Sequence, residues 1–196
     1  INEDIISPNS GFNTHSHSNM EIVTIVIKGE ITHRDSLNNL GIICEDEVQV
    51  MSAGTGISHS EKNEKNIDCK LFQIWIYPDV QNLKPSYNQM SIKNISGNNL
   101  IIDSFKKNNS LLCINQEISI WRCKYNRLNE KYLPSEIKNF NWIQIIEGDL
   151  LIRDKNNKSN KYLSSGDGLG FEISDISDID IESDTEVDFL LFSMPN

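Results

Sequence analysis

Two pairs of metal-binding residue types have the spacing of side chains on one face of a β-strand. His15 and His17 are two residues apart, and so are His59 and Glu61. Because successive side chains of a strand point to opposite faces, residues i and i+2 share a face. Imidazole nitrogens and carboxylate oxygens bind Fe, Mn, Ni, Cu and Zn. Two such pairs on neighbouring strands could therefore converge on one divalent transition metal ion.

The pair His59 and Glu61 strengthens the evidence that His15 and His17 bind a metal. A His-x-His pair alone is a weak signal, because two histidines lie this close by chance in many proteins. The chain has only four histidines, however, and three of them belong to the pattern. The second pair also follows Gly54 and Gly56, a loop signal next to a short strand. A metal site is therefore the better interpretation, with room left on the ion for water or substrate.

The sequence around these pairs predicts strands, and no stretch has a convincing helical period. Between Met20 and Ile27, apolar and mostly β-branched residues occupy both alternating faces, which is typical of a buried strand. Lys28-Gly29-Glu30 predicts a tight turn, and Ile31–Arg34 predicts the returning strand of a hairpin. Further strands are predicted at residues 48–51, 71–77, 101–102, 111–114, 118–125, 142–146, 150–152 and 189–192.

A weak internal repeat indicates two equivalent halves. Val26–Ile31 matches Ile145–Leu150 at an offset of 119 residues, and both segments predict strand, tight turn and strand. The polar stretch 79–99 is interpreted as the connection between the halves. We therefore expect a first domain over residues 1–85 and a second domain over residues 86–196.

The second half lacks the metal-binding pairs. Pro134 and Glu136 stand opposite His15 and His17, and no histidine follows His59. If the two halves are equivalent in fold, only the first can hold this metal site.

Other residues of the sequence are expected to lie outside the two metal-binding pairs or beside them. Glu21 is expected on the strand face of His17, where it either points into the same cavity or is hydrogen-bonded to a neighbour. His33 is expected to be structural, with a partner from another strand. The acidic series 174–184 predicts one or two strands with a wet face and not a calcium loop, since the required glycine is missing. The tryptophans are expected in the core or between barrels: Trp75, Trp121 and Trp142.

Composition excludes several classes of function. The 196 residues carry a formal net charge of -10 without a basic cluster, which argues against direct nucleic-acid binding. The longest apolar run is far shorter than the roughly 20 residues that cross a bilayer. The four cysteines lie far apart without a CxxC pair, so we expect a reducing, cytoplasmic location. The chain begins with Ile1 and not Met, and we expect upstream residues.

Four motifs of the first half form a specific set: Gly11-Phe12-x-Thr14-His15-x-His17-x-x-Met20-Glu21-Ile22-x-Thr24, Gly29-Glu30-Ile31-Thr32-His33-Arg34-Asp35-Ser36, Gln49-x-Met51-Ser52-Ala53-Gly54-x-Gly56-Ile57-x-His59-Ser60-Glu61 and Gln73-Ile74-Trp75. Through these motifs the first 78 residues resemble the pirin branch of the cupin superfamily, particularly its bacterial quercetinase-like members. The second half resembles the family's degenerate C-terminal barrel more loosely, through the Gly148 turn, the Gly166-Asp167 step and the apolar last strand.

The resemblance implies an all-β bicupin, with two small jelly-roll β-barrels packed together and little helix. It implies one mononuclear metal in the N-terminal barrel, with His15, His17, His59 and Glu61 as ligands. Members usually have additional strands upstream of the segment that matches Ile1, and those strands surround the first barrel.

The resemblance also implies an activity. Some bacterial members cleave quercetin with O2 and release carbon monoxide, so we expect a metal-dependent dioxygenase acting on a flavonol-like aromatic substrate, with Glu61 as the residue that accepts the substrate's hydroxyl proton. Iron is the expected ion, and Mn, Ni, Cu and Zn suit the same ligands. The alternative is a non-enzymatic metal-binding module that senses redox state or binds a protein partner, as a human member does. A monomer is expected.

Overall fold

The chain divides into two compact units of β-structure. The computed structural model describes residues 1–92, 96–104, 112–127 and 133–195, so the predicted strand residue Leu111 lies outside the described residues. The first unit comprises Ile1–Asn94 and Ser104–Gln116, and the second unit comprises Ile95–Asp103 and Glu117–Asn196. The chain thus changes unit more than once, whereas the sequence suggested a single change after residue 85.

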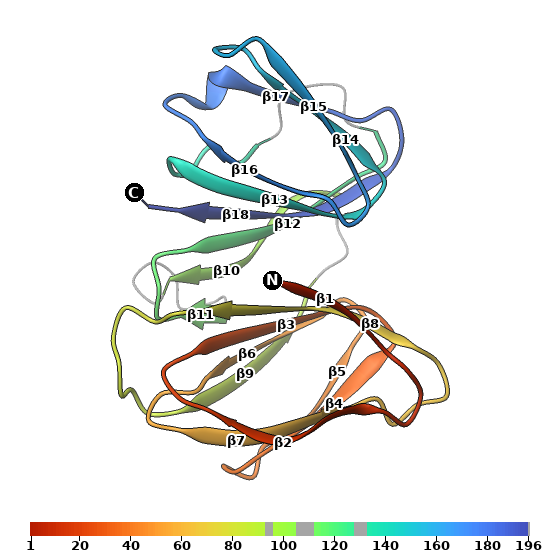
Figure 1. Cartoon of the computed structure of the whole chain (residues 1–196), viewed down its shortest axis with the longest axis vertical. Helices are drawn as coiled ribbons and strands as arrows, with labels where there is room; N and C mark the ends of the chain where they lie inside the picture. Colours follow the sequence, from red (N-terminus) through yellow and green to blue (C-terminus); the bar gives the residue numbers. More distant parts are fainter. Residues whose placement is uncertain (93–95, 105–111, 128–132, 196) are drawn as a thin grey trace. The chain divides into compact units, whose positions relative to one another are not determined.

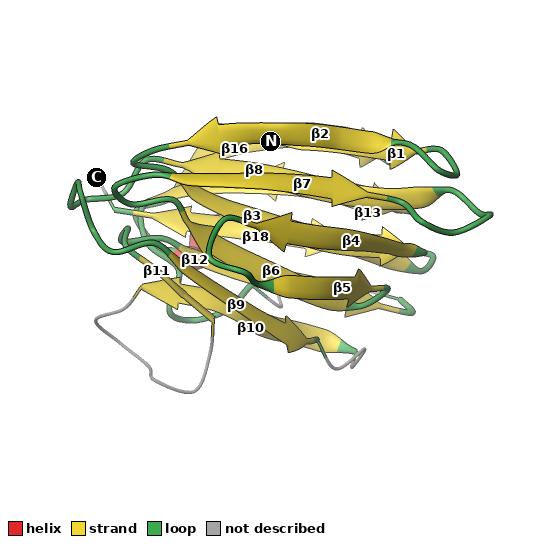
Figure 2. Ribbon diagram, turned by 90° about the horizontal axis from the view of Figure 1, so that it is seen from below, coloured by secondary structure: helices red, strands yellow, loops and turns green. Residues whose placement is uncertain are grey.

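Two antiparallel sheets form the first unit (Figure 1). One has the strand order β1-β8-β3-β6-β9, and the other has the order β2-β7-β4-β5, whose strands lie side by side in Figure 2. A short strand, β11 (Leu112–Ile114), also belongs to this unit. The other strands are β1 (Asn2–Ile6), β2 (Gly11–His17), β3 (Glu21–Lys28), β4 (Glu30–Asp35), β5 (Leu40–Cys44), β6 (Glu47–Ser52), β7 (Ile57–Lys62), β8 (Cys69–Ile76) and β9 (Ser86–Ser91).

The interior of the first unit is apolar at both ends and polar in the middle. On one face of β3, Thr24 stands between Ile22 and Val26, which belong to two separate apolar clusters. The register places Gln73 of β8 and Gln49 of β6 on either side of Thr24. All three polar residues are buried. Buried polar groups require hydrogen-bond partners. This polar band is therefore the part of the interior where other polar side chains can be bound.

The second unit has one larger apolar core. Its strands include a sheet with β10, β12, β18, β13 and β16 as successive neighbours and a sheet with the order β15-β14-β17. Both sheets contribute to a single cluster of buried residues around Phe189 and Ile181. The elements are β10 (Gly97–Ser104), β12 (Ser119–Tyr125), β13 (Phe140–Glu147), β14 (Asp149–Asp154), β15 (Ser159–Ser164), β16 (Gly168–Glu172), the 3-10 helix η1 (Ile176–Asp178), β17 (Ile179–Glu182) and β18 (Val187–Met194).

The predicted repeat corresponds to two equivalent hairpins. Gly29 joins β3 to β4 with φ of 80°, and Gly148 joins β13 to β14 with φ of 84°. Both values lie in the left-handed region that glycine adopts without steric cost. A Cβ at residue 29 would approach the carbonyl oxygen of Asp68 to 2.8 Å. The matching sequence segments therefore reflect the same turn geometry.

The all-β prediction is confirmed, with differences in detail. Among the described residues each unit is a pair of sheets, as in a jelly roll, and not one continuous closed barrel. The stretch 79–99 contains β9, which pairs with β6 at the edge of its sheet. Its polar sequence hid this strand, because an edge strand needs few apolar side chains. The acidic series contains η1 before β17, since Asp175 caps that short helix. No helix in the described ranges is long and apolar enough to span a membrane.

Candidate metal centre

Three neighbouring strands place the candidate residues on one inward face. β7 lies between β2 and β4. His59 of β7 is directly opposite His15 on one side and Asp35 on the other, while Glu61 is opposite His33. A register shift between Phe12 and His15 interrupts the β2–β7 ladder just before the histidines.

His15, His17 and His59 form a compact cluster. Their potential ligand atoms all lie within 4.8 Å of one another, and the three ring centroids are 4.5 to 5.1 Å apart. The structure thus brings together three of the four predicted ligands. Imidazoles bound to one ion at about 2.1 Å per bond require a similar convergence.

The free nitrogens of this cluster fit a bound cation. The Nδ1 of His15 lies 2.7 Å from the carbonyl oxygen of Asn13, to which it can only donate. In the neutral ring, Nε2 is therefore the atom without a hydrogen. The Nε2 atoms of His17 and His59 are buried without a hydrogen-bond partner among the described residues. Buried nitrogens without partners are costly unless an ion or another group satisfies them.

Burial favours the neutral form of His17 and His59. The pKa of His59 is lowered to about 3, first by burial and then by the nearby His15, His33 and His17, while Asp35 opposes the shift. The pKa of His17 is also lowered, first by burial and then by repulsion from His15. A neutral imidazole is the form that binds metal, so protons compete weakly for these ligands.

Glu61 lies beside the cluster and is held by two hydrogen bonds. Gln73 donates from Nε2 to Oε2 at 2.7 Å, and Thr24 donates from Oγ1 to Oε1 at 3.3 Å. Burial raises the pKa of Glu61, and these two hydrogen bonds partly oppose that effect. A carboxylate oxygen of Glu61 and one ring nitrogen each of His59 and His33 lie within 4.8 Å of one another. His15 and His17 do not belong to this second group of potential ligand atoms.

Thr24 and Gln73 hold Glu61, a role that the sequence reasoning did not assign to them although both stand in motifs of the family resemblance. Each is a polar residue inside an otherwise apolar strand, and each aligns with the other across β3 and β8. A single polar position inside an apolar run is the signal that could have identified them.

Glu21 does not point into the cluster. β2 ends at His17 and β3 begins at Glu21, so the two residues lie on different strands and the expected shared face is wrong. The Glu21 carboxylate accepts hydrogen bonds from Ser52 Oγ at 2.7 Å and from the backbone N–H of Asn115 at 3.2 Å. The alternative, a buried carboxylate paired with its neighbours, is the one that the structure bears out.

His33 has the expected partner from another strand, His59, but also one on its own strand that the sequence reasoning excluded. Its Nε2 lies 3.3 Å from Oδ2 of Asp35 on the same strand. Residues i and i+2 share a strand face, so this pairing follows from the same rule that links His15 to His17. Burial lowers the pKa of His33, which Asp35 partly counteracts.

Trp75, expected in the core or between barrels, is half-exposed beside the histidine cluster. Its side chain is 49% exposed, and its ring meets His17 edge to face with centroids 4.9 Å apart. The indole N–H donates to Oε1 of Gln73, the residue that also holds Glu61. Trp121 is buried in the core of the second unit, and Trp142 packs against Gly168 and Gly170.

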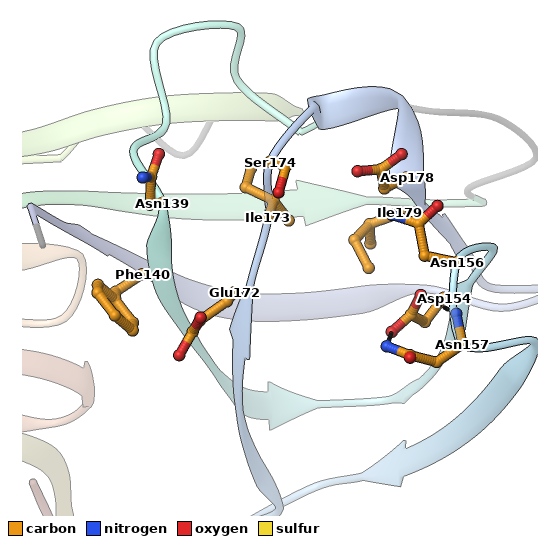
Figure 3. A pocket seen from close by; sticks show the side chains of 10 residues that line it. All are labelled: Asn139, Phe140, Asp154, Asn156, Asn157, Glu172, Ile173, Ser174, Asp178 and Ile179. Atoms are coloured by element: carbon orange, nitrogen blue, oxygen red, sulfur yellow. Dashed lines mark hydrogen bonds between the residues drawn. The ribbon is translucent and has the colours of Figure 1, made fainter.

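The second unit has a cavity whose lining includes carboxylates but no histidine. Figure 3 shows this cavity of ≈ 290 Å³, lined by side chains that include Asp154, Glu172 and Asp178. Asp154 is already bonded to Asn157, and Asp178 belongs to the cap of η1. Within the described part of the chain, both groups of side chains close enough to share an ion are in the first unit.

A two-sheet jelly roll with an inward histidine cluster is the architecture of cupin proteins with a candidate metal site. Comparison with known proteins identifies the family within the cupins. The family model described as Pirin matches residues 1–76, and the model described as Quercetinase C-terminal cupin domain matches residues 101–194. The chain belongs to the pirin family.

Individual relatives agree with this assignment. The protein named quercetin 2,3-dioxygenase in Escherichia coli (strain K12) is 33% identical over 196 residues, which span all of this chain and 81% of the relative. The crystal structure of YhhW from Escherichia coli superposes with a TM-score of 0.86 at 31% identity, covering 98% of this chain and 79% of that one. A second structure, of bacterial pirin YhhW in complex with nickel(II), has a TM-score of 0.83 at 31% identity and covers 98% and 80%.

Proposed function

We propose that His15, His17, His59 and Glu61 bind one divalent transition metal ion, and that the protein is a dioxygenase acting with O2 on a flavonol-like aromatic substrate. The observation that carries this proposal is the convergence of three imidazoles next to a buried carboxylate, with the Nε2 atoms of His17 and His59 buried without a hydrogen-bond partner among the described residues. The name of the 33% identical relative and the nickel(II) in a relative's structure support it. Iron remains the ion that we expect.

The bound ion would supply Lewis acidity for a substrate oxyanion and the means to bring O2 to the ring. The protein's own contribution starts with Glu61. Its carboxylate is 1% exposed and its pKa is raised by burial, so it holds a proton more tightly than a surface glutamate does. It is therefore suited to accept the proton of the substrate's hydroxyl group. Gln73 and Thr24 orient the carboxylate during that transfer.

Trp75 gives the cluster an aromatic wall that remains accessible. Half of its side chain is exposed, and its ring already contacts His17. Aromatic rings favour offset or edge-to-face contacts with other rings. A flat aromatic substrate bound near the cluster would therefore be oriented by Trp75.

The test is turnover of quercetin by the full chain, loaded in turn with Fe, Mn, Ni and Cu. We expect substrate loss, oxygen uptake and carbon monoxide release with at least one metal, and none under anaerobic conditions. The control is His59→Ala, which lacks one proposed ligand. Absence of oxygen-dependent loss with every metal would contradict the proposed activity. Full metal loading without turnover would favour a non-enzymatic pirin that binds a protein partner.

A further inference from the structure

A buried chain of three side chains runs from β4 to the histidine cluster. Oδ2 of Asp35 lies 3.3 Å from Nε2 of His33, and Nδ1 of His33 lies 3.5 Å from Nδ1 of His59. The side chains of His33 and Asp35 are fully buried, and His59 is 1% exposed. The two rings lie with centroids 5.2 Å apart.

The hydrogen-bond donors and acceptors around Asp35, His33 and His59 favour one arrangement of ring hydrogens. The Asp35 carboxylate accepts hydrogen bonds from the backbone N–H of Leu37 and from the backbone and side chain of Asn39. A carboxylate so surrounded by donors is an acceptor only, so Nε2 of His33 carries the hydrogen that faces it. In a neutral ring, Nδ1 of His33 is then the acceptor. Nδ1 of His59 must donate to it, which leaves Nε2 of His59 without a hydrogen.

The opposite pattern leaves two groups unsatisfied. If Nδ1 of His33 carried the hydrogen, its Nε2 lone pair would face the carboxylate of Asp35. His59 would then carry a hydrogen on Nε2, which is buried without a partner. Both conditions are unfavourable in a buried site.

The surroundings hold His33 in place. The ring of Tyr87 from the opposite sheet stacks on it at 4.8 Å with an interplanar angle of 34°. Gly41 is directly opposite His33 on β5, and a Cβ there would overlap the Tyr87 hydroxyl. Asn38, with φ of 66°, completes the turn that Asp35 organises. Asparagine tolerates this left-handed conformation.

We infer that His33, held by Asp35, is a positioning residue for His59: it accepts the Nδ1 hydrogen of His59 and thereby fixes the tautomer that presents Nε2 to His15 and His17. The inference rests on the proposed metal site and deepens it. Groups that orient a ligating histidine in this way typically change metal affinity about 10- to 100-fold when removed.

The first test reads the tautomer directly in the metal-free protein. Long-range ¹H–¹⁵N NMR of the full chain distinguishes protonated from unprotonated ring nitrogens, and single-histidine variants assign its four histidines. We expect His59 to be protonated on Nδ1 and His33 on Nε2. A His59 ring protonated on Nε2 would overturn the inference, whether or not the protein binds metal.

The second test measures nickel(II) affinity by competition with a chelator. We expect His33→Leu to weaken binding about 10- to 100-fold. His33→Gln, whose amide oxygen can accept from His59, should recover most of the affinity. Thr32→Val is the matched control, because Thr32 is also buried on β4 but bonds Glu64 on the other face. Equal affinities for His33→Leu and Thr32→Val would overturn the inference, whereas a wild-type chain that binds no nickel would contradict the proposed metal site instead.

Discussion

In His15 and His59, one ring nitrogen contacts a protein partner and the other faces the centre of the histidine cluster. Nδ1 of His15 bonds a backbone carbonyl, and Nδ1 of His59 faces His33. The remaining Nε2 atoms are thus set toward the centre before any ion arrives. Such preorganisation lowers the conformational cost of binding, because fewer side-chain torsions must be fixed by the ion itself.

Replacing Glu61 with glutamine should separate metal binding from turnover. The amide cannot accept a proton, so quercetin turnover should fall by about 10²- to 10⁴-fold, the range for loss of a general base. Three imidazoles remain, so the metal content should stay close to one ion per chain. Elemental analysis and steady-state kinetics check this, with Glu64→Gln as the control because that glutamate is half-exposed and pairs with Arg34. Unchanged turnover in Glu61→Gln would remove the carboxylate from the reaction.

Replacing Trp75 with leucine should weaken substrate binding and spare the ion. We expect KM for quercetin to rise roughly two- to tenfold, which corresponds to the loss of about 0.5–1.5 kcal/mol from an aromatic contact. Trp75→Phe should retain most of the affinity, and Tyr77→Leu, at a 77% exposed ring, should have no effect. A KM that does not change in Trp75→Leu would place the substrate elsewhere.

Strand alternation explains why the site lies in the middle of the first unit. Along β3 the inward residues Ile22, Thr24 and Val26 alternate apolar, polar and apolar, so the polar band is bounded by packed side chains at both ends. Glu61 reaches this band from β7 and finds its donors there. The surrounding apolar clusters keep water away from the carboxylate, which is the origin of its raised pKa.

Gly41 of β5 should be a sensitive position because it makes room for Tyr87. Gly41→Ala places a methyl group against the Tyr87 hydroxyl, and overpacking of this kind typically costs about 1–3 kcal/mol of unfolding free energy. Since Tyr87 stacks on His33, nickel affinity should fall as well. Denaturant unfolding and chelator competition measure the two effects.

A second substitution provides the control for this steric argument. Tyr87→Phe removes the overlapping oxygen, so Gly41→Ala with Tyr87→Phe should be more stable than Gly41→Ala alone. Additive losses in the double variant would show that the two residues do not interact in this way.

Periodicity in the sequence was enough to predict β3 and its hairpin with β4, but not β2 and β7, the polar strands that carry the two pairs. The hairpin at Gly29 and its equivalent at Gly148 are both present, and β3 is buried along both faces as its composition indicated. β9 was missed because its side chains are polar, and only its pairing with β6 identifies it.

At the site, the spacing of His15 and His17 and of His59 indicated the cluster, but the partners of Glu61 and Glu21 depend on register between distant strands. Local spacing contains no information about that register. The His33–Asp35 pairing was local and was missed although the strand period predicts it.

Across the whole molecule, the two units share a hairpin with a glycine turn but differ in the side chains that point into their interiors. At the repeat offset of 119 residues, Ile143 stands where the first unit has Thr24, and it is fully buried. At this position the second unit is therefore apolar, as part of a buried apolar cluster, where the first has a polar band. An apolar core contributes stability without a metal, so removal of the ion should not unfold the chain as it does a zinc finger.

Stability of the metal-free protein should fall with decreasing pH. The pKa of His59 is lowered to about 3 in the folded chain, against an ordinary value of 6.5. Between these values the unfolded chain binds a proton that the folded chain does not, so acid favours unfolding with a slope of about 1.4 kcal/mol per pH unit for one such group. Urea unfolding in the presence of a chelator, from about pH 7 to about pH 5, should show this loss. His59→Asn should have a shallower slope, and identical slopes would exclude His59 as a source.

Metal stoichiometry tests the proposed centre most directly. Elemental analysis of the full chain, purified without added metal, should find one divalent transition metal ion per molecule, with iron as the expected element. The His17→Ala and His59→Ala variants should lose it, because each lacks an imidazole of the cluster. Wild-type protein that stays free of metal even after loading, or variants that retain full occupancy, would contradict a metal centre built on these residues.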